Sequence, residues 1–248
     1  MTREPVNVVL VYPVVLGTYG DRGNVMALAH RARARGLVCR VTTVGLHDPL
    51  PRDGDIYVLG GGEDSSMLLA WRRLLDDDGL VAAVRGGAVA FCVCAGFQLL
   101  SRSFVGPKGT AYEGLGLLDV TCGRIDGPRA VGEVLAECTG IDGGEFLTGF
   151  ENHQGDARLG PAARPLGRVV RGTGNDDGTE GAVQGRVVGT YLHGPALVRN
   201  DALADHLLEQ VVGELAPFDD GPVRRLRAER RVAALRGRPP RRPAHHPR

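Results

Sequence analysis

The fold is decided by the stretch Val-Ala-Phe-Cys-Val-Cys-Ala-Gly-Phe-Gln-Leu-Leu at residues 89–100. A short apolar run rich in Val and Phe predicts a buried strand, which ends at Cys94. Two small residues, Ala95 and Gly96, follow it, and a helix begins after them. A cysteine on such a turn stands at the carboxyl end of a sheet, where the next helix supplies free N–H groups and the positive end of its dipole. Both stabilise a thiolate, and the N–H groups can hold an oxyanion, so the stretch predicts a nucleophilic cysteine.

Predicted strands and helices alternate on both sides of this turn. The chain before it gives strands at 6–12, 38–44 and 55–59, with helices at 25–35 and 65–75. After it come strands at 117–121, 131–137, 146–151, 166–171 and 186–192, and a helix at 201–214. This order predicts an α/β fold, with a mostly parallel Rossmann-like or flavodoxin-like sheet and helices on both faces.

Length and composition indicate one large domain. The chain has 248 residues, of which 43% are hydrophobic, enough for a full core. It contains no apolar run of about eighteen residues, and its first residues do not form a signal peptide. Five cysteines are an odd number and do not indicate a disulfide framework, so we expect reduced thiols and cytoplasmic residence. We place the domain at 1–218 and an Arg- and Pro-rich, partly disordered tail at 219–248.

The formal net charge of +1 hides a marked asymmetry. Residues 221–248 hold ten of the 30 basic residues and one of the 29 acidic residues, so this segment carries +9 and the other 220 residues carry −8. The last part, 236–248, lacks the residues to form a core and is predicted to be disordered. Arginine is in excess over lysine along the whole chain, so the arginines of the tail are not special to it. We therefore interpret the tail as an extension without a nucleic-acid partner. Contact with nucleic acid or anionic lipid headgroups is the alternative.

Two glycine-rich segments precede the cysteine. Gly60-Gly61-Gly62 ends the strand at 55–59, and its N–H groups are predicted to contribute to an oxyanion hole. The alternative is a flexible turn before the following helix. The loop at 17–24 has neither dinucleotide-binding nor P-loop spacing, and we expect it to lie over the active face or against a partner. Asn24, at its end, is predicted to cap the helix at 25–35.

The cysteine needs a base, and two histidines lie at strand ends. His193 ends the apolar strand at 186–192 and is followed by Gly-Pro, which stops the strand and exposes the imidazole. A neutral imidazole can take the thiol proton and later protonate the leaving group. His153 is the rival, and we interpret it as structural. Cys92 is assigned to the core, because no further Cys or His pair is spaced to complete a metal site with Cys94.

These residues carry a family resemblance. The run Cys94-Ala95-Gly96-Phe97-Gln98-Leu99-Leu100 resembles the C-x-G-x-Q-L-L nucleophile motif of class I, triad-type glutamine amidotransferases. Four further segments, at 21–24, 60–64, 149–153 and 191–195, look like the cobyric-acid-synthase-like branch of that family. Within the branch they are most similar to the glutaminase subunits of lipid II isoglutaminyl synthases. The resemblance covers roughly residues 6–212.

The resemblance implies roles for individual residues. Cys94 would be the nucleophile and His193 the general base and acid. Arg129 would clamp the α-carboxylate of glutamine, for which a planar guanidinium is suited, and Arg124 is its rival. The backbone around Gly61 and the N–H of Ala95 would form the oxyanion hole, and Gln98 would help to shape the glutamine pocket.

One departure from the family pattern concerns the acid. Many triad amidotransferases carry a carboxylate two residues after the histidine, and here that position is Pro195. The orienting carboxylate must come from elsewhere, from a partner subunit, or be absent, which a cysteine enzyme tolerates better than a serine enzyme. We therefore hypothesise that the glutaminase is weak until a synthetase subunit docks and supplies or orders the missing acid.

The activity implied by the resemblance is glutamine hydrolysis to glutamate and ammonia, without a metal or cofactor on this chain. Ammonia would pass to a Mur-ligase-like synthetase subunit, which is expected to hold ATP and Mg²⁺, for amidation of the D-glutamate α-carboxyl in lipid II. The resemblance thus implies a heterodimer that serves peptidoglycan synthesis. The alternatives are an amidotransferase subunit or stand-alone γ-glutamyl cysteine hydrolase of another pathway, such as cobyric-acid-type amidation, and a binding module that has kept the fold without the activity.

Overall fold

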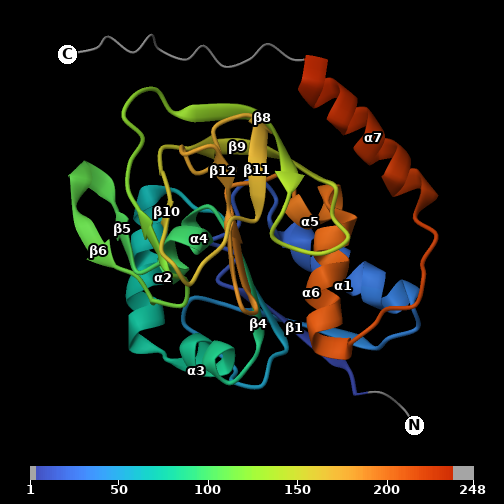
Figure 1. The fold of residues 1–248 in the computed structure, drawn as a ribbon. Coiled ribbons are helices and arrows are strands. Elements are labelled where there is room, and N and C mark those ends of the chain that lie inside the picture. The colour runs from blue at the N-terminus through green and yellow to red at the C-terminus, as the bar shows by residue number, and fades with distance from the viewer. Residues whose placement is uncertain (1–3, 237–248) are drawn as a thin grey trace.

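The centre of the molecule is a six-stranded sheet, seen in a computed structural model that describes residues 4–236 (Figure 1). The strand order is β13-β14-β4-β3-β1-β2, where only β13 runs antiparallel to its neighbour. The bounds are β1 Val6–Val11, β2 Cys39–Val44, β3 Ile56–Leu59, β4 Val89–Val93, β13 Ala182–Gln184 and β14 Val187–Thr190. The predicted α/β fold with a mostly parallel sheet is confirmed.

Helices cover both faces of this sheet, as predicted. One face carries α1 (Arg22–Ala34), α5 (Ala196–Arg199) and α6 (Asp201–Val212), and the other carries α2 (Asp64–Asp76), α3 (Gly79–Arg85) and α4 (Ala95–Leu100) (Figure 1). Successive strand residues point to opposite faces, so Ile56 and Val58 pack in one hydrophobic cluster and Tyr57 and Leu59 in the other. The central strands are apolar throughout because both of their faces are buried.

Two smaller sheets lie outside the central one. The first has the order β10-β7-β5-β6, and the second has the order β12-β11-β8-β9. Their bounds are β5 Ser103–Val105, β6 Ala111–Glu113, β7 Val120–Cys122, β8 Ala130–Cys138, β9 Phe146–His153, β10 Arg158–Leu159, β11 Gly167–Arg171 and β12 Thr179–Glu180, and a short 3₁₀ turn spans Pro107–Gly109. The strands predicted at 131–137, 146–151 and 166–171 are therefore present. They form their own antiparallel sheet, because short connections allow hairpins but not the crossovers of a parallel sheet.

The basic C-terminal segment begins as a helix, α7 (Gly221–Arg236), which lies beside β8 and β9 (Figure 1). The Arg231 guanidinium stands 3.7 Å from the centre of the Phe146 ring, and Arg227 is paired with Asp201 of α6. The first half of the segment assigned to the tail is thus helical and packed. The disorder predicted for its end concerns residues beyond Arg236, outside the described part.

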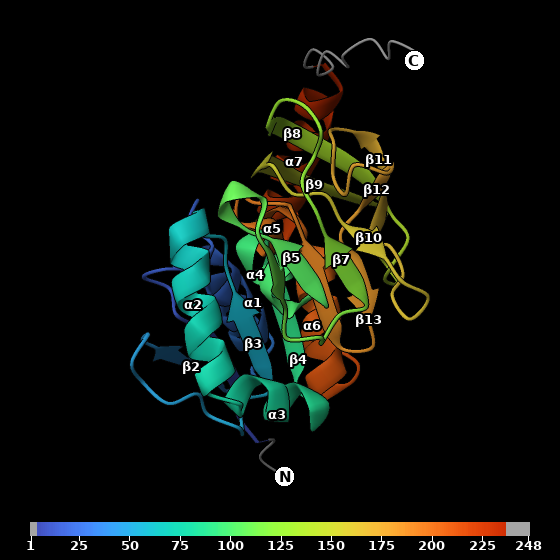
Figure 2. The same cartoon turned by 90° about the vertical axis from the view of Figure 1, so that its left-hand side faces the viewer.

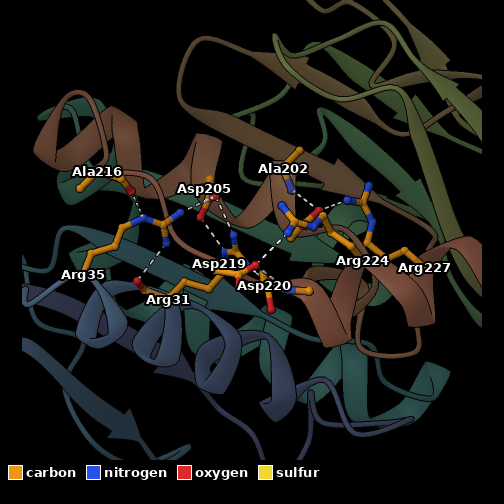
Figure 3. A network of polar contacts seen from close by, with 11 residues as sticks. Arg31, Arg35, Ala202, Asp205, Ala216, Asp219, Asp220, Arg224 and Arg227 are labelled. Atoms are coloured by element: carbon orange, nitrogen blue, oxygen red, sulfur yellow. Dashed lines mark hydrogen bonds and ion pairs between the residues drawn. The ribbon is translucent and has the colours of Figure 1, made fainter.

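A cluster of ion pairs holds the segment before α7 against α1 and α6 (Figure 3). Arg31, only 6% exposed, contacts both Asp205 and Asp220, and Arg35 lies 2.8 Å from Asp205. The ring of Phe218 lies against both guanidinium groups. Buried charges need several partners to offset their lost hydration, and here each member has at least one. The cluster therefore fixes the chain that leads into α7.

No helix within residues 4–236 is long and apolar enough to cross a membrane.

Candidate active site

The site lies at the carboxyl edge of the central sheet. Strands β14, β4, β3 and β1 are neighbours and run parallel, so the segments that follow them meet at one edge. Ligand sites of open α/β sheets form at this edge. Figure 2 shows β8 and β9 above it, and a backbone bridge between Phe150 of β9 and His193 connects this second sheet to the site.

Cys94 stands between β4 and α4, as predicted. Its backbone has φ 51° and ψ −104°, a conformation that non-glycine residues rarely adopt, and its side chain is partly exposed. Gly96 lets α4 start against the end of β3, because a β-carbon there would stand 2.8 Å from Cβ of Leu59. The sharp turn thus presents the thiol at the sheet edge.

His193 is brought to Cys94 by the end of β14. It is 1% exposed, and its backbone N–H and C=O pair with Phe150. Its Nε2 atom is buried and makes no conventional hydrogen bond within the described residues. Burial lowers the pKa of His193, but the contacts with Asp21 and Cys94 outweigh it and raise the pKa to about 9. The imidazolium is therefore the favoured form of His193 at neutral pH.

The chain itself supplies a carboxylate to His193. Asp21, 1% exposed, lies in the loop before α1, and its Oδ2 is 3.3 Å from Nδ1 of His193. The same oxygen accepts a 2.7 Å hydrogen bond from the N–H of Gly61. The structure therefore shows an orienting acid that comes from elsewhere in this chain, which is one of the three possibilities considered. Docking is therefore not needed to supply this acid, and the hypothesis that docking orders the site and raises the activity stays a prediction.

Two further contacts tie the Asp21 loop to the His193 turn. Gly23 lies directly against Pro195, since a β-carbon on Gly23 would stand 2.3 Å from Cγ of Pro195. Asn24 Oδ1 accepts a 2.9 Å hydrogen bond from the N–H of Leu197. The prediction that the loop lies over the active face is confirmed. The prediction that Asn24 caps the helix that follows it is wrong, because this helix, α1, begins already at Arg22. The Asn24 side-chain oxygen instead accepts from the first turn of α5.

The glycine turn lies between these groups. A β-carbon on Gly61 would be 2.6 Å from Cε1 of His193 and 3.4 Å from Cβ of Cys94. Because the N–H of Gly61 donates to Asp21, the prediction that Gly61 itself donates to an oxyanion is wrong. The N–H groups of Gly62 and Ala95 donate to no acceptor within residues 4–236. Ala95 therefore remains a predicted donor, and of the backbone around Gly61 the N–H of Gly62 is one that is left without an acceptor.

The two arginine candidates lie in different surroundings. Arg129 is exposed and binds the backbone oxygen and side chain of Asn152, whose amide contacts the hydroxyl of Tyr19. The Tyr19 ring centre is 4.9 Å from that of His193, so this chain of contacts reaches the base. Arg124 lies 3.9 Å from Asp64, shortly after the glycine turn. Both stay candidates for the glutamine carboxylate.

The remaining predicted residues lie behind the elbow. The amide of Gln98 packs against Gly155, and its contact with glutamine stays a prediction. His153 binds the Gly155 carbonyl through Nδ1 at 2.7 Å and stacks on the Tyr191 ring at 3.9 Å, which confirms its structural role. Cys92 is fully buried, as predicted, with Sγ 3.2 Å from the carbonyl oxygen of Val188.

Sequence reasoning missed two acids of this region. Asp21 was visible only as part of the 21–24 motif, and its role depends on a contact between residues 172 apart in the chain. Glu180 is fully buried and accepts hydrogen bonds from the Thr190 hydroxyl and the Tyr191 N–H. Burial raises the pKa of Glu180 to about 7. No sequence signal marks it, because it lies in a turn-rich stretch. Within the described residues, no three His, Cys, Asp or Glu gather as metal ligands.

A thiol on a strand-to-helix turn beside a histidine and a carboxylate, at the edge of a parallel sheet, is the arrangement found in cysteine-dependent acyl-transfer enzymes. The model of the CobB/CobQ-like glutamine amidotransferase domain matches residues 7–201, and the chain belongs to this family.

Relatives agree with this assignment, and a solved structure shares the fold. The chain is 34% identical over 82% of its length to the subunit GatD of lipid II isoglutaminyl synthase (glutamine-hydrolyzing) from Streptococcus pneumoniae, covering 78% of that protein. It is 36% identical over 79% of its length to GatD from Staphylococcus aureus, again covering 79% of the relative. A cobyric acid synthase from Methylobacterium nodulans is 39% identical, but over 59% of this chain and 30% of that protein. A crystal structure of a glutamine amidotransferase shares the fold with a TM-score of 0.55 and 20% identity, covering 84% of this chain and 99% of that one.

Proposed function

We propose that this chain is the glutaminase subunit of a lipid II isoglutaminyl synthase. It hydrolyses L-glutamine to glutamate and ammonia, and a Mur-ligase-like (MurT-like) partner uses the ammonia to amidate the D-glutamate α-carboxyl of lipid II. The observation that carries this proposal is the similarity to two GatD subunits along more than three quarters of both chains. The site supports it with a thiol, a base and an acid in mutual reach.

The chemistry starts from the thiolate–imidazolium pair. The Cys94 sulfur attacks the side-chain carbonyl carbon of glutamine, and the carbonyl oxygen takes the negative charge. The N–H groups of Gly62 and Ala95 are the donors available to this oxygen. The bond between carbon and nitrogen then breaks, and His193 gives its Nε2 proton to the leaving ammonia. A γ-glutamyl thioester on Cys94 remains.

The second half returns the enzyme to its starting state. The now neutral His193 takes a proton from water, and the hydroxide attacks the thioester carbonyl carbon. The bond between carbon and sulfur breaks, and the product leaves as the γ-carboxylic acid, which loses its proton to solvent to give glutamate. The proton taken from water stays on His193 beside the Cys94 thiolate. The chain's own residues are sufficient for both steps. ATP and Mg²⁺ belong to the ligase reaction and are assigned to the partner, in a cytoplasmic heterodimer that serves peptidoglycan synthesis.

A second candidate function is amidation in another pathway, such as that of cobyric acid. Its support is the similarity to cobyric acid synthases, one of which is 39% identical to this chain. That similarity spans less than a third of the relative, whereas the GatD similarity spans 79% of the Staphylococcus aureus protein. The extent of the match therefore favours the lipid II enzyme.

The test of the glutaminase has two parts. A glutamine-like electrophile should label Cys94, found by peptide mass spectrometry, and Cys94→Ala should resist the reagent and release no glutamate. Cys122→Ala is the matched control, because Cys122 is a buried thiol whose pKa is raised by burial to about 12. The Cys122→Ala variant should be labelled at Cys94 to the same extent as the parent chain. Labelling at another residue, or none even with the partner present, would favour a binding module.

The acceptor is tested by co-expression with candidate ligases. A Mur-ligase-like protein should co-purify with the chain, and the complex should convert the D-glutamate carboxyl of lipid II into an amide with glutamine and ATP. Amidation of a corrinoid acid by a complex that leaves lipid II unchanged would select the second candidate.

A further inference from the structure

The loop between β1 and α1 carries the only carboxylate that the described structure places on Nδ1 of His193. Asp21 Oδ2 is 3.3 Å and Oδ1 is 3.4 Å from this nitrogen, and both side chains are 1% exposed. The opposite ring nitrogen, Nε2, is the one left for Cys94. The ring thus has an acid on one side and the nucleophile on the other, which is the order of a catalytic triad.

We propose that Asp21 is the positioning residue of His193, holding the imidazole so that Nδ1 keeps its proton and Nε2 serves Cys94. This proposal rests on the proposed glutaminase activity and adds to it the third member that Pro195 removes from its usual place. The acid follows β1, whereas His193 follows β14, and β4 and β3 lie between these two strands in the sheet.

The surroundings of Asp21 fix its direction. Its Oδ2 accepts the Gly61 N–H at 2.7 Å, so the carboxylate cannot rotate away from the histidine without losing a buried hydrogen bond. The loop is pressed against the His193 turn by Gly23 on Pro195 and by Asn24 on Leu197. Residues 21, 23 and 24 thus meet residues 193, 195 and 197 in order. Pro195, which excludes an acid at its own position, helps to seat the loop that brings one.

The charge environment of His193 agrees with this role. It is faced by Asp21 and the Tyr19 ring from the loop, by Cys94 from the elbow, and by Glu180 from β12, whose charge acts on it through the buried interior. Arg199 of α5 packs on Gly194 but is paired with Glu133 of β8. Asp21 and Cys94 raise the His193 pKa against burial, so removal of the Asp21 charge should lower that pKa.

The experiment compares Asp21→Asn with the parent chain, full length, alone and with its synthetase partner. The variant keeps the shape of the side chain and removes its charge. Glutamate release should fall about 100-fold in kcat with little change in KM, less than the ~10⁴-fold cost of the same change in a Ser-His-Asp enzyme. The alkaline limit of activity should move to lower pH, because catalysis needs the His193 proton. The acid limit of Cys94 alkylation by iodoacetamide should move to higher pH, because less imidazolium stabilises the thiolate.

The control is Asp119→Asn, which removes another buried carboxylate that accepts a backbone N–H and pairs with an arginine outside the site. It should leave both pH limits in place. Unchanged kcat and pH limits in Asp21→Asn would overturn the proposal.

A measurement on the parent chain covers the case in which Asp21→Asn does not fold. ¹⁵N NMR of His193 above its pKa should show the proton on Nδ1, and a proton on Nε2 would overturn the proposal. If the parent chain released no glutamate even with a partner, the proposed function would fail. The alkylation and NMR measurements would still decide the role of Asp21.

Discussion

Gly61 and His193 approach each other so closely that a β-carbon on the glycine would stand 2.6 Å from Cε1 of the imidazole. Because Gly61 also donates its N–H to Asp21, one residue without a side chain contacts both the base and the acid. The middle glycine of the run is therefore required by its neighbours in space, and its own backbone φ is ordinary.

Gly61→Ala should displace His193 by a few tenths of an ångström or more and lower kcat for glutamine hydrolysis about 100-fold, because catalysis is sensitive to small misplacement of the base. The measurement is glutamate release with unfolding monitored in parallel. Gly221→Ala is the control, since a β-carbon there meets only one atom, at 3.6 Å, and it should leave kcat unchanged. A fully active Gly61→Ala would show that the histidine tolerates displacement.

Arg129→Ala should raise KM for glutamine about 10- to 100-fold, the effect of losing a charge-assisted hydrogen bond of roughly 1.5–3 kcal/mol. Arg124→Ala should change KM only a few-fold. Asn152→Ala separates a direct clamp from an indirect effect, because it breaks the contact between Arg129 and Tyr19 while leaving the guanidinium in place. The reverse ranking of the two arginine variants would assign the clamp to Arg124.

Glu180 should make stability depend on pH. Burial raises its pKa to about 7 from the ordinary glutamate value of 4.5, so between these values the folded chain holds a proton that the unfolded chain has lost. This contribution to stability is complete below about pH 4.5 and is lost as the pH rises to about 7. One pKa unit is worth about 1.4 kcal/mol, so Glu180 should make the free energy of unfolding about 3 kcal/mol smaller at high pH than at low pH. Glu180→Gln should abolish this pH-dependent difference.

Urea unfolding at pH 5 and pH 8 measures this difference. Glu229→Gln, on the exposed surface of α7, is the control and should keep it. A Glu180→Gln variant with the same difference as the parent chain would place the pH dependence on other groups.

Arg31→Ala should lower the free energy of unfolding by about 3–5 kcal/mol, because it leaves the buried carboxylate of Asp220 without its arginine partner and Asp205 with Arg35 alone. Arg52→Ala breaks an ion pair with Asp78 whose side chains are 65% and 71% exposed, and it should cost less than about 1 kcal/mol. Denaturant unfolding of the two variants makes the comparison. Equal losses would show that the cluster of Figure 3 does not hold the C-terminal segment.

The parts of the site that could be predicted from sequence are those set by local order. The apolar run, the cysteine and the small residues after it determine the turn at Cys94, and a strand that stops at Gly-Pro determines where His193 lies. The alternation of strands and helices likewise gave the parallel sheet. Each of these features is formed by residues close together in the chain.

The parts that could not be predicted depend on contacts between distant segments. Asp21 meets His193 only because β1 and β14 end at the same edge, and the family pattern directed attention to residue 195. Asn24 was interpreted as a cap of the helix that follows it because its residue type suits one, whereas in the fold its side-chain oxygen accepts a hydrogen bond from the N–H of Leu197. The N–H of Gly61 was assigned to substrate because nothing local shows that a carboxylate already occupies it.

The contacts between the 21–24 loop and the 193–197 turn have a consequence for biosynthesis. Asp21 and Cys94 leave the ribosome early, but the base that both require is encoded after residue 190 and docks only when β14 joins the sheet beside β4. An incomplete chain therefore carries a thiol without its base. We therefore expect nascent and truncated chains not to consume glutamine, and ammonia release to begin only with the finished domain.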